Sequence, residues 1–396
     1  MTRKAAAFGC HNIHDLREAA RRFLPRGLFE FIDRGAEDEL CLERDVAAFR
    51  RVRLLPRVLR DVSRADPAGE LLGGPAAFPL AVAPTGGAGM VRHHGDLLLA
   101  RAAAAAGVPF AISSASNMEV EQICRAGGRL WFQLYLWEDR SLSMAVVERA
   151  RAAGCEALVV TADIPVSPNR EYNRRNGFAS PFRLGFGNAA DILSHPRWFT
   201  AVMLRYLREG GMPAQANLPR PLAHAVTREA APRARFRGDS LTWDEVARMR
   251  DGWPGRFVLK GLLRPDDAER AVALGVDGIV VSNHGGRSLD CAAATLEALP
   301  DVVAAVSGRA EVLVDSGVRR GSDIAKALAL GARGVLAGRA PLYGLAAGGQ
   351  AGVEYALDLL KEEFVRTMGL CGARDLSELD AGLLWRSPAE IPAGPS

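Results

Sequence analysis

Two residues that could do chemistry stand three positions apart, directly after a run of apolar residues. The run Ile279-Val280-Val281 turns polar within three residues and leads to His284 and Arg287, with two glycines between them. An imidazole can take up a proton near neutral pH, and a guanidinium offers a planar pair of donors that suits a carboxylate. A lone histidine in such a place is more often a hydrogen-bonded core residue, so the rest of the chain decides its role.

Seven further apolar segments end in polar or ionisable residues in the same way. Each reads as a short buried strand followed by an alanine-rich, helix-compatible stretch, which is the rhythm of a (β/α)8 TIM barrel. A polar group after every strand is typical of the carboxyl face of such a barrel, where active sites lie. No Gly-x-Gly-x-x-Gly motif follows the first strand, so a dinucleotide-binding sheet is not supported. The predicted strands span residues 80–86, 110–114, 130–135, 157–163, 256–261, 278–284, 311–317 and 334–339.

The last two predicted strands end in the residues best suited to hold a phosphate. Residues 315–319, Asp-Ser-Gly-Val-Arg, precede a predicted helix, and Gly338 and Arg339 end the final strand. A phosphate bound by the loops after strands seven and eight, through backbone N–H groups and an arginine, recurs in these barrels. Together with the hydroxyl, amide and lysine side chains at the other strand ends, this predicts an anionic ligand that is planar or phosphorylated.

The composition excludes several classes of protein. With 396 residues, 48% hydrophobic and 24% charged, the chain is typical of a soluble globular protein with a large core. No apolar run approaches the roughly 18 residues of a membrane span, and the amino-terminal residues do not form a usable signal peptide. The six cysteines are scattered without Cys-x-x-Cys spacing, which favours a reducing cytoplasm over a disulfide framework or a cysteine zinc site. A net charge of +4 is too small to suggest nucleic acid.

The rhythm of the strands predicts a single domain built of four parts. Residues 1–78 form an N-terminal helical and wrapping segment, with Pro25 interrupting the helical part at 12–34. Residues 79–164 and 241–345 form the barrel, and residues 346–396 form a C-terminal helix and a tail that frays after Ser387.

The segment 165–240 interrupts the barrel after its fourth strand. It is rich in proline, and residues 164–237 carry twelve arginines against four acidic residues. Within it, residues 198–208 combine basic and aromatic side chains, as interfacial helices do. A lid, an oligomer contact and a membrane contact are all compatible with such an insertion.

These motifs together resemble the FMN-dependent α-hydroxy-acid dehydrogenase/oxidase family. The resemblance covers about residues 14–380, with the strand motifs in the family's order. Pro84-Thr85-Gly86, the Ser-Ala-Ser-Asn-Met run at 114–118 and the His-Pro-Arg-Trp run at 195–198 resemble the mandelate-oxidising members in particular. The motifs that carry the family resemblance are Ser282-Asn283-His284-Gly285-Gly286-Arg287, Gln133-Leu134-Tyr135, Lys260-Gly261 and Asp315-Ser316-Gly317-Val318-Arg319-Arg320-Gly321.

The resemblance implies a role for each matched residue. His284 would be the general base, with Asp163 behind it to stabilise the imidazolium. Arg287 and Arg170 would hold the substrate carboxylate, and Tyr135 would hydrogen-bond the substrate oxygen. Two simpler interpretations remain open. Asp163 could pair with an arginine, and Lys260 could belong to a structural ion pair. The implied FMN contacts are Pro84, Thr85, Gly86, Ser113, Gln133, Thr161, Lys260 near flavin N1 and O2, Ser282 and Gly317, with Asp315, Arg319, Gly338 and Arg339 at the ribityl phosphate end.

Two departures from the family pattern bear on the substrate. The family usually has a tyrosine in the N-terminal segment that helps to bind the substrate carboxylate, and here Phe31 stands in its place. One hydrogen bond, worth about 0.5–1.5 kcal/mol net, is thereby lost. Ala115 stands where glycolate oxidase has a bulky tryptophan, and a small residue leaves room for an aryl group. Phe31 and Ala115 together predict a wide, rather apolar substrate pocket.

The resemblance therefore implies an FMN-dependent (S)-2-hydroxy-acid dehydrogenase that acts on an aryl or bulky substrate and passes electrons to a quinone or similar acceptor. The resemblance also implies a cytoplasmic homotetramer. Because mandelate-type members dock on the membrane through the corresponding insertion, we expect peripheral contact with the inner membrane as well. A soluble oxidase that uses O₂ and releases H₂O₂ is one alternative. A flavin-barrel isomerase and a non-catalytic binding protein are others. The residues leave open whether His284 takes the Cα proton, giving a carbanion, or the hydroxyl proton during hydride transfer.

Overall fold

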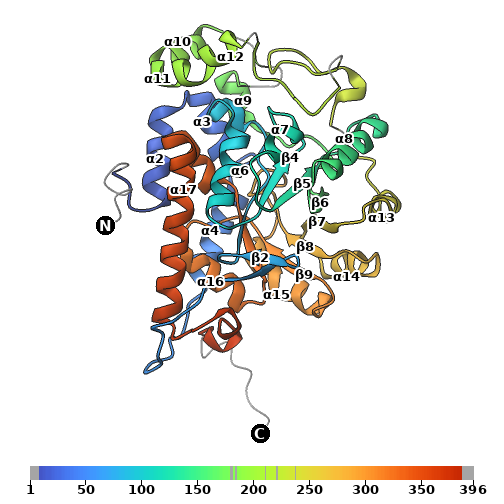
Figure 1. Ribbon diagram of the computed structural model, residues 1–396. Helices are drawn as coiled ribbons and strands as arrows, with labels where there is room; N and C mark the ends of the chain where they lie inside the picture. Colours follow the sequence, from blue (N-terminus) through green and yellow to red (C-terminus); the bar gives the residue numbers. More distant parts are fainter. Residues whose placement is uncertain are drawn as a thin grey trace.

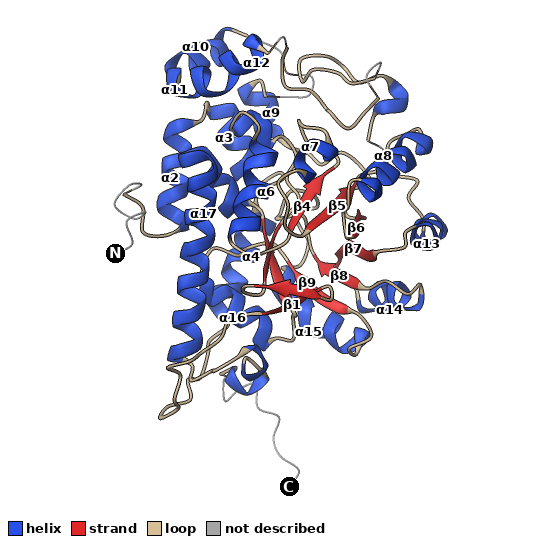
Figure 2. Ribbon diagram, in the orientation of Figure 1, coloured by secondary structure: helices blue, strands red, loops and turns tan. Residues whose placement is uncertain are grey.

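Eight parallel strands close into a barrel at the centre of the molecule, in the order β10-β3-β4-β5-β6-β7-β8-β9 (Figures 1 and 2). The structure is a computed structural model, and it describes residues 9–178, 182, 185–209, 211–219, 222–236 and 238–385. The predicted (β/α)8 barrel and all eight of its strands are confirmed. The strands are β3 Leu80–Val82, β4 Phe110–Ser113, β5 Leu130–Leu134, β6 Ala157–Thr161, β7 Arg256–Leu262, β8 Gly278–Val281, β9 Glu311–Val314 and β10 Gly334–Ala337.

Alternation along each strand builds two apolar layers. In β6, Ala157 and Val159 point into the barrel interior, whereas Leu158 and Val160 belong to the larger cluster beneath the helices. A small antiparallel hairpin, β1 Gly69–Leu71 and β2 Gly74–Ala76, adds Leu71 to the interior cluster. The interior is therefore a packed core, and the open end of the barrel is left to the polar strand ends.

Helices surround the barrel and lie between consecutive strands (Figure 2). The predicted helical segment before the barrel is confirmed as two helices separated at Pro25, which is the amino-terminal cap of the second. The last helix bends at Gly348 and Gly349, whose backbone angles are not helical. The helices outside the insertion are α2 Ile13–Phe23, α3 Arg26–Asp33, α4 Leu40–Arg51, α5 Ala88–Val91, α6 Gly95–Ala105, α7 Val120–Cys124, α8 Arg140–Ala152, α13 Trp243–Gly252, α14 Pro265–Ala273, α15 Thr295–Val306, α16 Gly321–Ala329 and α17 Arg339–Leu370, with 3₁₀ turns at Leu376–Glu378 and Ala381–Leu383.

The insertion after β6 forms a helical cap at the top of the view in Figure 1. The predicted amphipathic piece at 198–208 is helical, but part of its apolar face packs inward. Trp198 and Val202 are buried, and the Trp198 indole Nε1 donates to the Met90 carbonyl at 2.9 Å. Pro181, Pro221 and the tail after Ser387 lie outside the described residues. The insertion comprises α9 Glu171–Asn176, α10 Phe186–Ser194, α11 Pro196–Trp198, a π-helix Phe199–Met203, α12 Leu204–Arg208 and a 3₁₀ turn Pro232–Ala234.

The described helices are too short or too polar to span a bilayer. The helices α10 and α12 of the cap expose the large apolar side chains Phe186, Leu193 and Leu207.

Candidate active site

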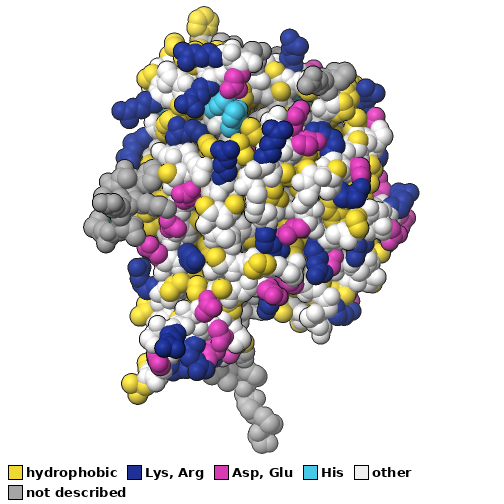
Figure 3. Space-filling model, in the orientation of Figure 1, with side chains coloured by type: hydrophobic (Ala, Val, Ile, Leu, Met, Phe, Trp, Pro, Cys, Tyr) yellow, Lys and Arg dark blue, Asp and Glu magenta, His cyan; other side chains and the backbone are white. Residues whose placement is uncertain are grey.

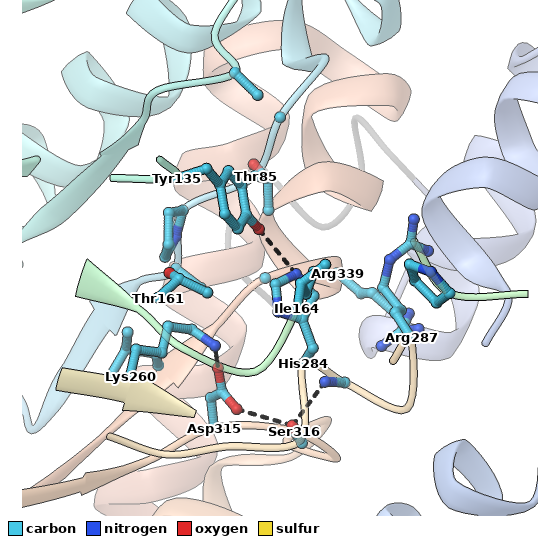
Figure 4. A pocket seen from close by; sticks show the side chains of 18 of the residues that line it. Thr85, Tyr135, Thr161, Ile164, Lys260, His284, Arg287, Asp315, Ser316 and Arg339 are labelled. Atoms are coloured by element: carbon cyan, nitrogen blue, oxygen red, sulfur yellow. Dashed lines mark hydrogen bonds and ion pairs between the residues drawn. The ribbon is translucent and has the colours of Figure 1, made fainter. Parts of the chain in front are cut away.

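The carboxyl ends of the strands surround a cavity of about 440 Å³, seen from close by in Figure 4. Its volume is within the range of small-molecule sites. Four of the residues predicted from the sequence do not line the cavity but lie behind its wall, namely Ser113, Gln133, Asp163 and Ser282. The structure brings the others together in the wall: Phe31, Pro84, Thr85, Gly86, Ala115, Tyr135, Thr161, Arg170, Lys260, His284, Arg287, Asp315, Gly317, Arg319, Gly338 and Arg339.

His284 lies between a phenol and a carboxylate. Its Nε2 is 3.0 Å from the Tyr135 hydroxyl, and its Nδ1 is 2.9 Å from Asp163 Oδ1 (Figure 4 shows the contact with Tyr135). An ionised Asp163 can only accept a hydrogen bond, so it places the ring proton on Nδ1 and leaves the Nε2 lone pair facing the cavity. Asp163 thus faces the imidazole rather than an arginine.

The protonation states of this pair follow from burial and neighbouring charge. Burial lowers the pKa of His284, and Asp163 opposes that shift only in part. Burial by itself would raise the pKa of Asp163, but the charges on His284 and Lys260 outweigh it, so its pKa is lowered. A neutral imidazole beside an ionised carboxylate is therefore the resting state at neutral pH, which is the state of a competent proton acceptor.

The backbone at His284 adopts a conformation that few residues with a side chain accept. Its φ is 61°, in the left-handed region, and Gly285 and Gly286 follow with φ of 69° each. The His284 N–H donates to Ser282 Oγ at 3.1 Å, and the Gly285 N–H donates to Ser316 Oγ at 2.9 Å. These contacts hold the turn that presents the imidazole, and strained residues of this kind concentrate at functional sites.

Lys260 brings a buried positive charge to the cavity wall. Its Nζ lies 2.7 Å from Asp315 Oδ2 and donates to Ser282 Oγ at 2.6 Å. Burial by itself would lower the pKa of Lys260, but Asp315 and Asp163 outweigh it and raise the pKa. The ammonium is therefore permanently charged. Lys260 is both a member of an ion pair and part of the site.

Three arginines gather on the opposite side of the cavity without an acidic partner. Arg287 Nη1 donates to the Arg34 carbonyl at 2.9 Å, and Arg170 Nη2 donates to the Arg287 carbonyl at 3.2 Å. Arg339 donates to the carbonyls of Asp33 and Arg34 at 3.0 and 3.1 Å. Within the described ranges, no carboxylate lies within salt-bridge distance of Arg170, Arg287 or Arg339. Burial and the neighbouring arginines lower the pKa of Arg287 and of Arg339 to about 10.

Positive charges held this closely repel one another, and a buried cation without a counter-charge is costly. Binding of an anion between the guanidinium groups would therefore relieve this repulsion and is favoured. Phe31 stands at the position of the expected tyrosine and offers no hydroxyl. The Arg287 guanidinium lies over the Phe31 ring, with its Cζ 5.2 Å from the ring centroid.

Glycines make room along the cavity wall. Gly317 has a φ of 86°, and a Cβ there would lie 2.7 Å from the Asp45 carbonyl oxygen. A Cβ on Gly86 would lie 2.9 Å from the Ala115 Cβ. Thr85 Oγ1 is buried and has no hydrogen-bond partner in the part of the chain that the structure describes. A buried hydroxyl of this kind requires a partner from outside the chain.

A hydrogen-bonded relay supports the wall from behind. Ser113 Oγ donates to Gln133 Oε1 at 3.2 Å, and Gln133 Nε2 donates to Thr161 Oγ1 at 2.9 Å. All three side chains are buried, so the relay fixes the orientation of the Gln133 amide and of the Thr161 hydroxyl.

Sequence reasoning missed the apolar residues that the insertion and its two flanking residues add to the cavity. Ile164, Val166, Phe236 and Leu241 also line it, and the Phe236 ring packs edge-on against the Tyr135 ring at 5.4 Å between centroids. Nothing in the irregular insertion pointed to these positions, because no helical or strand periodicity relates them to the barrel. Ser316 was likewise missed as a partner of the His284 turn, although its place beside Asp315 in a strand-end motif was a usable signal.

A closed (β/α)8 barrel with a histidine and several arginines gathered at its strand ends is typical of barrel enzymes that act on small anions. The sequence profile of the FMN-dependent dehydrogenases matches residues 20–386. The chain belongs to this FMN-dependent 2-hydroxy-acid dehydrogenase/oxidase family, and its cofactor is FMN.

Relatives with different names share this similarity. The (S)-mandelate dehydrogenase of Pseudomonas putida is 42% identical over 374 residues, which cover 94% of this chain and 93% of that protein. The L-lactate oxidase of Nostoc sp. is 41% identical over 378 residues, which cover 94% and 97%. A crystal structure of the monotopic membrane protein (S)-mandelate dehydrogenase superimposes with a TM-score of 0.88 at 40% identity, covering 96% of this chain and 100% of that one.

Proposed function

We propose that this protein oxidises an aryl or otherwise bulky (S)-2-hydroxy acid to the 2-oxo acid and passes the electrons to a quinone or a similar acceptor. The observation that carries the proposal is that His284, Tyr135, Arg170 and Arg287 line one cavity, with the Tyr135 hydroxyl 3.0 Å from His284 Nε2. A 2-hydroxy acid presents a carboxylate and a neighbouring C–H and O–H, and this arrangement provides one group for each.

In the proposed reaction, different residues of the chain bind the substrate and accept its proton. Arg287 and Arg170 bind the substrate carboxylate and so orient the carbon that bears the hydroxyl group. The Tyr135 hydroxyl binds the substrate oxygen, and His284 Nε2 accepts a proton from the substrate. Asp163 stabilises the imidazolium that forms. Bound FMN supplies a two-electron acceptor.

The residues present in the wall fit FMN as the occupant of the rest of the cavity. Lys260 offers a positive charge to a ring system that gains negative charge on reduction. Thr85 offers a hydroxyl that lacks a partner, and Arg319 and Arg339 offer charge to a phosphate. Together with the glycines that let the backbone approach, these groups would hold the cofactor along one side and leave the arginine side to the substrate.

The apolar wall supports a bulky substrate. Ala115 leaves space where a large side chain would narrow the cavity, and Phe31, Ile164 and Leu241 present apolar surface to it. The related proteins are named for mandelate and for lactate, which differ at this side chain. The cavity wall favours the larger of the two.

The helical cap supports electron transfer at a membrane. Phe186, Leu193 and Leu207 are 100%, 77% and 51% exposed, and Arg197 and Arg208 accompany them in the cap. Exposed apolar side chains beside basic ones suit the interface of an anionic bilayer. We therefore propose peripheral docking on the cytoplasmic face of the inner membrane. Sedimentation of the protein with anionic liposomes tests this docking. If binding to the liposomes does not weaken as salt is added, the basic side chains do not contribute to it as proposed.

The deciding experiment follows the flavin spectrum. The purified protein should be yellow, and its absorbance should bleach under anaerobic conditions with (S)-mandelate faster than with L-lactate. A colourless protein that does not take up FMN, or a flavin that no 2-hydroxy acid bleaches, would refute the proposal. The latter outcome is also the one expected of an isomerase or a binding protein.

A soluble oxidase is the second candidate, and the similarity to an L-lactate oxidase over almost the whole chain favours it. The two candidates differ in the electron acceptor. Release of H₂O₂ in air at the rate of substrate turnover would establish the oxidase, whereas slow peroxide release with rapid reduction of a quinone would establish the dehydrogenase.

A further inference from the structure

His93, His94 and Glu209 form a cluster that the proposed reaction does not use. The two histidines lie directly before α6, and Glu209 follows the last residue of α12 in the insertion. None of the three lines the active-site cavity. Figure 3 shows histidine side chains at the surface near the top of the molecule, beside an acidic side chain and among basic ones.

The donor atoms of the cluster converge on one point. His93 Nε2 lies 3.0 Å and His94 Nε2 lies 3.6 Å from the same oxygen, Glu209 Oε2. The two imidazole rings are stacked with centroids 3.8 Å apart, and the three donor atoms all lie within 4.8 Å of one another. Two ligands of a tetrahedral zinc ion, each at 2.0–2.2 Å from it, are about 3.4 Å apart. The cluster therefore has the spacing of a zinc site before any metal enters.

The surroundings hold the first histidine in place. His93 is buried at 7% exposure, and the edge of the Tyr206 ring packs against it at 4.7 Å between centroids. His94, in the left-handed conformation with φ of 58°, caps the start of α6, which places the adjacent rings on one side of the chain.

Arginines also lie in the same shallow hollow, and they bear on which ligand it takes. Arg92, Arg101 and Arg205 line it together with the two histidines. The Arg92 guanidinium is engaged elsewhere, because it donates to the carbonyls of Leu345 and Ala346 and lies over the Phe23 ring at 4.3 Å. The remaining arginines favour an anion, such as chloride or phosphate, in the open fourth position of the metal.

We propose that His93, His94 and Glu209 bind a zinc ion, with the fourth position open to water or an anion. Nitrogen and carboxylate donors in this number suit Zn²⁺ better than the hard cations Mg²⁺ and Ca²⁺. Because Glu209 belongs to the cap and the histidines belong to the barrel, the metal ties α12 to the start of α6. Zinc thereby fixes the cap against the barrel.

The test measures zinc binding to the FMN-loaded protein without an affinity tag. Chelator-treated protein is dialysed against ZnCl₂, and bound zinc is counted by atomic emission for wild type, His94→Ala and Glu209→Gln. His195→Ala is the matched control, because His195 is a partly buried histidine of the same insertion that lies outside the cluster. All proteins carry Cys291→Ala, which removes an exposed thiol that could bind zinc by itself.

We expect one zinc per chain in wild type and in His195→Ala, and binding weakened about 10-fold or more in each ligand variant. Hydrogen exchange of the backbone amides at 199–209 should slow on zinc addition in wild type and not in Glu209→Gln. Unchanged flavin content and circular dichroism show that the variants are folded. Equal zinc binding in all four proteins, or no binding in wild type, would overturn the proposal. Stoichiometric binding of inorganic phosphate without any zinc binding would assign the hollow to the arginines and also overturn it.

Discussion

The strongest test of the proposed chemistry is Asp163→Asn, which removes the negative charge behind His284 and keeps the shape of the side chain. The His284 Nδ1 contact with Asp163 at 2.9 Å is buried, and the proposed reaction makes the imidazole positive. A hydrogen bond to a charged group is worth about 1.5–3 kcal/mol. Each 1.36 kcal/mol is a factor of ten in rate, so the substrate-dependent reduction of the flavin should slow about 10- to 150-fold.

The pH dependence gives the same variant a second and more specific signature. A base works when it is unprotonated, so the rate of flavin reduction should rise with pH through the pKa of His284. Asp163 raises the pKa of His284 against the effect of burial. Without that charge the pKa falls further, so the midpoint of the profile should move to lower pH while the plateau drops. The measurement is anaerobic stopped-flow absorbance with saturating (S)-mandelate over the pH range in which the protein is stable.

Asp96→Asn is the matched control. Asp96 is a buried carboxylate that does not line the cavity, and burial raises its pKa to about 6, so an amide replaces it at little cost. This variant should keep the plateau and the midpoint of wild type. The role assigned to Asp163 is refuted by a plateau within about 3-fold of wild type. A plateau that drops without any shift of the midpoint would also refute it, since that is the behaviour of a structural defect.

Further predictions concern the substrate site and stability. Arg287→Ala should raise the KM for (S)-mandelate about 30-fold or more, because a buried charge pair is worth about 2–5 kcal/mol; steady-state kinetics would show it. Phe31→Tyr restores a hydroxyl beside Arg287 and should lower KM by about 2- to 10-fold, as one added hydrogen bond allows. Ala115→Trp should reduce kcat/KM for (S)-mandelate far more than for L-lactate, and equal losses would place the aryl group elsewhere. Burial raises the pKa of Asp45 from 3.8 to about 7, so ionisation of this group destabilises the folded protein increasingly as pH rises through that interval. Asp45→Asn should therefore melt above wild type at pH 8 and lose this advantage toward pH 4, as measured by differential scanning calorimetry.

The barrel and most of the candidate site could be predicted because their signals are local. Each strand is a short apolar run, and the polar residue at or just past its end, such as Lys260 near the end of β7 or Asp315 after β9, is read directly from the sequence. Parallel strands in a barrel end on one face, so these residues were expected to meet. The His-Gly-Gly-Arg turn after β8 added a resemblance that named the cofactor and the class of reaction.

The structure of the insertion could not be predicted from local sequence patterns. Its composition was compatible with a lid, an oligomer contact or a membrane contact, and the structure divides its apolar residues between two roles. Trp198 and Val202 anchor the cap to the barrel, whereas Phe186 and Leu193 remain exposed. Residues such as Phe236 and Leu241 reach the cavity through an irregular path that no periodic pattern describes.

The sequence by itself determined the barrel, the imidazole that we propose as the proton acceptor and the positive charges of the site, because these follow from apolar periodicity and from residue type. Only the tertiary structure decided how the arginines are held. Arg287 and Arg339 both donate to the carbonyl of Arg34, which is 253 and 305 positions away in the chain. Among the described residues the arginines have no carboxylate partner, and His93 and His94 converge on Glu209; both features depend on distances between segments far apart in sequence. The sequence shows which side chains could bind an anion or a metal. The fold determines whether neighbouring groups already neutralise the charges of those side chains.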